Sequence, residues 1–166
     1  VMADPRSGTF IAFGEQGTVL RLAEGESTWR VVPSPTTSPL NDGLFDPATG
    51  DAWLVGATGT VLRSADRGLS WQRVDVGVRT DLRHLSRDTV RGTLFITGVH
   101  GTLLRSGDGG QQWTALDPGT TAQLRRLINE PRGPGLLLVG RDGVLLRSVD
   151  GGLNWQPVPT FTDARF

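Results

Sequence analysis

The sequence predicts an all-β protein made of four repeats, each with four antiparallel strands, and three observations support this fold class. One pattern recurs every 42 residues, and its tryptophans are Trp29, Trp71, Trp113 and Trp155. The repeats consist of short runs rich in Val, Leu, Ile, Phe and Thr, bounded by Gly and Asp-Pro, without a helical period. A period of about 40–45 residues suits one four-stranded blade. Together these features indicate a β-propeller-type chain of four blades.

The third repeat illustrates the expected order of strands, which we place at residues 81–87, 92–98, 101–106 and 112–116. Its second strand is apolar at consecutive positions, which is typical of a strand buried on both faces between neighbouring blades. The approximate blade limits are 4–45, 46–87, 88–129, and 130–166 together with 1–3, within one domain 1–166. In this register, residues 164–166 begin a strand that residues 1–3 continue.

A Gly-x-x-Gly sequence separates the second and third strands of every repeat. The glycine pairs are Gly14 and Gly17, Gly56 and Gly59, Gly98 and Gly101, and Gly140 and Gly143. Glycine supplies positive φ or a close approach of backbone at no steric cost. The residues between the glycines vary, so we interpret these segments as scaffold turns that carry individual side chains.

The hairpin between the third and fourth strands carries Ser-x-Asp-x-Gly-x-x-Trp three times. The copies are Ser64, Asp66, Gly68 and Trp71; Ser106, Asp108, Gly110 and Trp113; and Ser148, Asp150, Gly152 and Trp155. Ser and Asp oxygens can accept hydrogen bonds from turn N–H groups, so we expect a structural role. The pattern resembles the Asp-box (BNR) repeat of β-propellers. The first repeat departs from it, with Leu22, Glu24 and Glu26 in place of Ser, Asp and Gly.

The wider repeat Gly-x-x-Gly-Thr-Leu-Leu-Arg-Ser-x-Asp-Gly-Gly-x-x-Trp is similar to that of the photosystem II assembly and stability factor family and its bacterial relatives. The family ordinarily has about seven blades, so this chain is short. The resemblance implies a non-enzymatic propeller outside the cytoplasm, in a periplasm or lumen, that holds another protein during assembly.

The amino-acid composition argues against several classes of partner and enzyme. Seventeen basic residues balance 17 acidic ones, so we expect no nucleic-acid partner. The chain has no Cys and no apolar run long enough for a membrane span. It also has no Tyr, the nucleophile of retaining sialidases. A two-carboxylate glycosidase through Asp81, Asp142 or Asp163 has no recognisable pairing. We therefore predict no catalytic residues, no metal and no cofactor.

Arginines supply two groups of candidates. Arg21, Arg63, Arg105 and Arg147 recur with Asp4, Asp46, Asp88 and Glu130, and we expect ion pairs within or between blades. An aperiodic group breaks the repeat symmetry on or before the first strands, and it is the predicted binding site. Its members are Arg79, Arg83, His84, Arg87, Arg125 and Arg126. Arg suits the bidentate capture of a carboxylate.

The predicted function is a non-catalytic scaffold for protein binding or assembly. The alternatives are a glycan-binding module or part of an Asp-box glycoside hydrolase, and an engineered or excised repeat fragment without its own function. A further prediction is a homodimer, in which two chains complete one larger ring.

Overall fold

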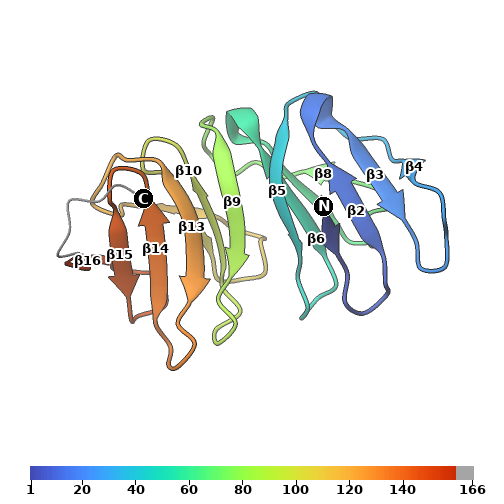
Figure 1. The fold of residues 1–166 in the computed structure, drawn as a ribbon. Helices are drawn as coiled ribbons and strands as arrows, with labels where there is room; N and C mark the ends of the chain where they lie inside the picture. The colour runs from blue at the N-terminus through green and yellow to red at the C-terminus, as the bar shows by residue number, and fades with distance from the viewer. Residues whose placement is uncertain (160–166) are drawn as a thin grey trace. The chain divides into compact units, whose positions relative to one another are not determined.

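The computed structural model describes residues 1–159, which form four separate four-stranded antiparallel sheets (Figure 1). The chain divides into two compact units, Val1–Asp81 and Leu82–Phe166. Each unit contains two sheets, which we number as blades 1 to 4 in chain order. Within residues 1–159 there is no α-helix. The predicted all-β, propeller-type fold class with four four-stranded blades is confirmed.

The first unit contains blades 1 and 2. Blade 1 consists of β1 (Met2–Ala3), β2 (Phe10–Phe13), β3 (Val19–Leu22) and β4 (Arg30–Val31), and blade 2 of β5 (Leu40–Phe45), β6 (Ala52–Gly56), β7 (Val61–Ser64) and β8 (Gln72–Arg73). The strands of each blade pair in sequence order. Two short 3₁₀ segments, η1 (Glu15–Gly17) and η2 (Ala57–Gly59), join the second strand of each blade to the third.

The second unit contains blades 3 and 4, with the same order of pairing. Blade 3 consists of β9 (Leu82–Arg87), β10 (Leu94–Gly98), β11 (Leu103–Ser106) and β12 (Thr114–Leu116), and blade 4 of β13 (Leu124–Asn129), β14 (Leu136–Gly140), β15 (Leu145–Ser148) and β16 (Gln156–Pro157). In Figure 1, β9 is green and β13 is orange, and these two first strands lie side by side.

The sheets are offset from the approximate blade limits that we expected from the repeat. Residues 40–45 close the expected blade 4–45, but as β5 they pair with β6 in the next sheet, because a short turn brings these two strands together. The same offset applies to β9 and β13. The strand that residues 164–166 were expected to begin lies outside the described residues. A single domain over 1–166 stays a prediction.

Each unit is held together by apolar side chains packed between its two blades. The cluster of the first unit joins Ile11 and Val19 of blade 1 to Leu54 and Leu62 of blade 2. The equivalent cluster of the second unit is built from Phe95, Leu103, Leu124, Leu127, Leu136, Leu138 and Leu146. All residues of β6 and β10 are buried, as the consecutive apolar positions predict, whereas β2 and β14 are partly exposed.

The Gly-x-x-Gly segments are turns in which the two glycines are needed for different reasons, one for positive φ and the other for a close approach of backbone. The second glycine and the residue before it both have positive φ, for example 54° at Thr58 and 69° at Gly59. The amide of Thr60 then donates to the Ala57 carbonyl at 3.1 Å, as in a two-residue hairpin. The first glycine, Gly56, is extended at φ −158°, and a Cβ there would overlap the Pro39 carbonyl. The tight turn therefore centres on the last two residues of the motif.

Candidate functional site

The three complete Asp boxes share one hydrogen-bond arrangement. In blade 4 the Ser148 hydroxyl donates to the Asp150 carboxylate at 2.8 Å and accepts from the Gly152 amide at 2.9 Å. The Asp150 carboxylate also accepts from the amides of Leu153 and Asn154. Equivalent bonds are made by Ser64, Asp66 and Gly68 in blade 2 and by Ser106, Asp108 and Gly110 in blade 3. The carboxylate of each box therefore closes its own hairpin.

These hydrogen bonds hold the box carboxylates in their ionised form. The pKa of Asp108 is lowered mainly by the amide of Gln112 and then by the Ser106 hydroxyl. The pKa of Asp150 is lowered strongly by the amide and side chain of Asn154 and by the Ser148 hydroxyl. At Asp66, burial favours the protonated form, but hydrogen bonds from its serine neighbours outweigh burial and lower the pKa.

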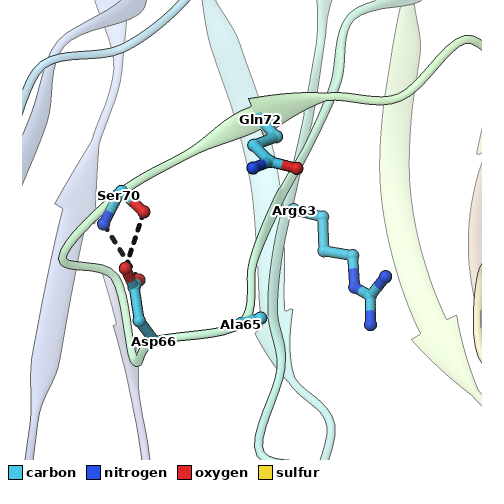
Figure 2. A pocket seen from close by; sticks show the side chains of 5 residues that line it. All are labelled: Arg63, Ala65, Asp66, Ser70 and Gln72. Atoms are coloured by element: carbon cyan, nitrogen blue, oxygen red, sulfur yellow. Dashed lines mark hydrogen bonds between the residues drawn. The ribbon is translucent and has the colours of Figure 1, made fainter.

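A small open hollow lies beside the Asp box of blade 2 and is lined by Arg63, Ala65, Asp66, Ser70 and Gln72. Figure 2 shows Asp66 turned toward Ser70, whose amide and hydroxyl donate to its carboxylate at 2.9 and 2.6 Å, while the Arg63 guanidinium lies apart from it. The repeat-equivalent hollow in blade 4 is lined by Arg147, Val149, Asp150, Asn154 and Gln156. Because their carboxylates are engaged within the hairpin, we assign these hollows to the scaffold.

Two of the three box glycines lie against a large side chain from the preceding blade of the same unit. Gly68 faces Ile11, and Gly152 faces the ring of Phe95. Both glycines have positive φ, at 81° and 79°. A side chain at either position would strain the backbone and overlap its neighbour.

Blade 1 lacks this arrangement because its box is incomplete. Glu26 stands where the other boxes have glycine, and its carboxylate accepts from Arg30 at 2.7 Å and from the Ala23 amide at 3.3 Å. Trp29 is 38% exposed, whereas its repeat equivalent Trp71 is 6% exposed. The hairpin of blade 1 is therefore anchored less deeply than that of blade 2.

The periodic arginines make two kinds of contact, only partly as expected. Arg147 forms the predicted ion pair with Glu130, with two hydrogen bonds of 2.5 and 2.9 Å. Arg63 pairs with Asp51 instead of Asp46, and its guanidinium lies 5.5 Å from the centre of the Trp53 ring.

Arg21 and Arg105 instead donate to main-chain carbonyls of the next blade. Their Nε–H groups donate to the carbonyls of Arg67 at 3.0 Å and of Gly151 at 3.1 Å, which are equivalent positions of two boxes. The acids Asp4 and Asp88, which we expected to pair with these arginines, close turns instead: their carboxylates accept from the amides of Arg6 and Val90. Turn amides lie nearer to these acids than the arginine of the third strand does.

The six predicted binding residues do not form one group. Arg79 belongs to the first unit, where its guanidinium pairs with Asp75 at 3.0 Å, and both side chains are exposed. The other five are in the second unit. Arg87 lies at the far end of β9, where its carbonyl accepts from the Asn129 side chain at 2.9 Å and its guanidinium packs near Gly92.

The remaining four residues come together at the beginning of β9 and β13. Arg83 and His84 are on β9, and Arg125 and Arg126 are on the neighbouring β13. Arg125 and Arg126 are both exposed. Within residues 1–159, neither of their side chains makes an ion pair or a hydrogen bond. This end of the second unit therefore presents two adjacent guanidinium groups to solvent.

Two further basic residues lie at the same end, and the sequence did not identify them as members of the cluster. The Arg141 amide donates to the Gln123 carbonyl at 2.8 Å, which fixes this residue beside the start of β13. His100 precedes Gly101, whose amide donates to the Ala122 carbonyl at 3.0 Å. Both side chains are exposed. The sequence does place both residues in the variable centres of Gly-x-x-Gly turns. Assigning them to the cluster, however, requires knowing which strand lies next to those turns.

The described part of the chain offers little support for other kinds of site. Among residues 1–159, no three His, Asp or Glu side chains gather in a way that could hold a metal ion. No helix there is long and apolar enough to span a membrane. Of the three carboxylates considered for glycosidase chemistry, Asp81 accepts from the Thr58 amide at 3.1 Å, Asp142 lies in a tight turn with φ 57°, and Asp163 lies outside the described residues.

Solved structures with the same fold include proteins of different function. A structure of YCF48 bound to a D1 peptide aligns with 99% of this chain at 22% identity and a TM-score of 0.70. YCF48 from Cyanidioschyzon merolae aligns with 79% at 26% identity and a TM-score of 0.65. The GH74 enzyme of Niastella koreensis aligns with 95% at 20% identity and a TM-score of 0.69. This chain spans 53%, 43% and 24% of those three chains, respectively.

Comparisons of sequence alone show to which of these proteins the chain is related. No curated protein matches the sequence. A family model described as photosynthesis system II assembly factor YCF48 matches residues 21–124, which is more than half of the chain and includes the complete boxes of blades 2 and 3. The predicted resemblance to Asp-box propellers of the assembly-factor type is thereby confirmed, and the chain belongs to the photosynthesis system II assembly factor YCF48 family.

Proposed function

We propose that this chain is a non-catalytic scaffold that binds a protein partner, and that the second unit captures an acidic segment of that partner at the beginning of β13. The observation that carries the proposal is the pair Arg125 and Arg126, exposed and without an internal partner among residues 1–159. Guanidinium groups bind carboxylates through paired, charge-assisted hydrogen bonds. Most other arginines described above are already engaged within the scaffold.

Membership of the YCF48 family supports a protein as the partner. A YCF48 structure holds a D1 peptide, so a propeller of this kind can bind a peptide. A D1-like segment is therefore a reasonable first ligand to test on this chain. A location outside the cytoplasm, and a homodimer that completes a larger ring, stay predictions. The glycan-binding alternative is supported only by the fold shared with GH74 enzymes.

The test is a titration of the intact chain into a fluorescein-labelled acidic peptide with a free C-terminal carboxylate, measured by fluorescence anisotropy. The Arg126→Glu variant should weaken binding at least tenfold, since hydrogen bonds to charged groups contribute about 1.5–3 kcal/mol. Arg132→Glu is the matched control, because Arg132 is also exposed, follows the other end of β13 and changes the net charge equally. Equal binding by the two variants would contradict the proposal, and a wild-type chain that binds no peptide would also refute it.

A further inference from the structure

Blade 1 presents one apolar sheet face that is partly open to solvent. We call it the leading face, and it consists of Phe10, Ala12, Leu20 and Leu22 from β2 and β3. In the ladder Phe10 is opposite Leu22, and the two remaining residues are opposite each other, so all four side chains lie on the same side of the sheet. Phe10 is 42% exposed, and the other three are partly exposed.

Blade 4 presents a second apolar face of this kind. We call it the trailing face, and it consists of Ile128, Leu137, Val139 and Leu145 from β13, β14 and β15. Leu137 is opposite Ile128 on one side, and Val139 is opposite Leu145 on the other, so these side chains also share one side of their sheet. Ile128 is 42% exposed, and the other three are partly exposed.

The 42-residue repeat shows what such faces do elsewhere in the chain. The trailing face of blade 4 is equivalent to the side of blade 1 that packs on blade 2, formed by Met2, Ile11, Phe13 and Val19. The leading face of blade 1 is equivalent to the side of blade 4 that packs on blade 3, formed by Leu136, Leu138, Leu146 and Ser148. Phe10 is 42% exposed, whereas its equivalent Leu136 is fully buried. The chain therefore carries both sides of one more interblade interface.

A polar contact of the internal interfaces has its two components on these blades as well. The third-strand arginines of blades 1 and 3 donate to a main-chain carbonyl in the hairpin of the following blade. The equivalent arginine of blade 4 is Arg147, which pairs with Glu130 of its own blade, and the equivalent carbonyl of blade 1 belongs to the exposed Gly25. One position departs from the internal pattern: Glu26 replaces the box glycine, and its carboxylate adds a charge opposite to that of an arginine.

We infer that two copies of this chain associate, with the trailing face of each copy packed on the leading face of the other. A second copy is the occupant because each face matches, position by position, the partner that the opposite face has inside the chain. The aligned YCF48 structure supports a pair, since this chain spans 53% of that chain and two copies together have about its length. Each contact joins two different faces, and using both faces of both copies closes the assembly at two. The inference is independent of the peptide binding proposed above.

The test measures the mass of the intact chain by light scattering over a dilution series. Phe10→Asp places a carboxylate in the leading face and Ile128→Asp places one in the trailing face. Leu69→Asp is the matched control, because Leu69 is an exposed leucine of the blade 2 hairpin, outside both faces, and gains the same charge. The wild type and the control should have twice the 17.8 kDa of one chain. Each face variant should raise the dissociation constant at least about 100-fold, because it buries an unpaired charge in both contacts of the pair.

Mixing the two face variants distinguishes this arrangement from any other dimer. Phe10→Asp keeps an intact trailing face and Ile128→Asp keeps an intact leading face, so an equimolar mixture should form a mixed pair through one remaining contact, at concentrations where each variant alone is monomeric. Urea midpoints equal to that of the control will show that both variants are folded, and Phe10→Ser replaces Phe10→Asp if its midpoint is lower. A monomeric wild type, an assembly larger than two copies, a dimer that either face variant leaves intact, or variants that do not complement each other would overturn the inference.

Discussion

Replacing Gly152 with alanine should lower the free energy of unfolding by about 2–5 kcal/mol. Gly152 has φ +79°, and a left-handed backbone costs about 1–2 kcal/mol for a residue with a Cβ. The new Cβ would also overlap the ring of Phe95, which is fully buried and cannot move into solvent. Overpacking of a tight core costs about 1–3 kcal/mol. Urea denaturation followed by tryptophan fluorescence measures the change.

Gly119→Ala is the matched control for the packing part. Gly119 is in the same unit and has φ +74°, but no atom outside its neighbours lies within 4 Å of the added Cβ. Its substitution should cost only the backbone contribution of about 1–2 kcal/mol. Removing the ring in a Phe95→Ala background should also make Gly152→Ala less costly there by about 1–3 kcal/mol. Equal costs for Gly152→Ala and Gly119→Ala, with no coupling to Phe95, would refute this account of the box glycine.

Two further predictions concern the polar contacts of the scaffold. Hydrogen bonds lower the pKa of Asp150 in the folded state, so its carboxylate stabilises the fold above the unfolded pKa, which is about 3.9. This stabilisation is lost as the pH falls through the lower folded pKa. Urea midpoints at pH 5 and pH 3 should therefore differ less for Asp150→Asn than for the wild type. Arg105→Ala should lower the free energy of unfolding by about 1–2 kcal/mol, since it leaves the Gly151 carbonyl without its interblade donor. The ion pair of Arg147, whose own side chain is about half exposed, should contribute below about 1 kcal/mol, and thermal unfolding of both alanine variants tests this order.

The parts of the fold that depend on local chemistry could be predicted from the sequence. The Gly-x-x-Gly turns and the Ser-Asp-Gly hydrogen bonds of the boxes involve residues within a few positions of one another, so their residue types indicate their geometry. The partners of Arg21 and Arg105 could not be predicted in this way. Their side chains reach a carbonyl 46 residues away, and nothing in the acceptor's residue type marks it.

In the candidate site, too, some features could be predicted from the sequence and others could not. The sequence identified Arg125 and Arg126 because they break the repeat, but it grouped them with Arg79, which belongs to the other unit and pairs locally with Asp75. It could not identify the β-bulge at Arg125, where Leu124 is opposite Gly140 and Arg126 is opposite Val139, since an extra residue in a ladder is visible only when both strands are aligned. The backbone hydrogen bond from Arg141 to Gln123, beside this bulge, likewise joins residues 18 positions apart.

The hydrogen bonds from Arg21 to Arg67 and from Arg105 to Gly151 have a consequence for how such a chain grows by gene duplication. The acceptor is a main-chain carbonyl, so the bond does not depend on whether the accepting residue is arginine or glycine. At these two junctions the arginine of one repeat therefore finds its acceptor whatever residue the following copy carries at that position. The accepting position can change its residue type in a copied repeat without a compensating substitution of the arginine.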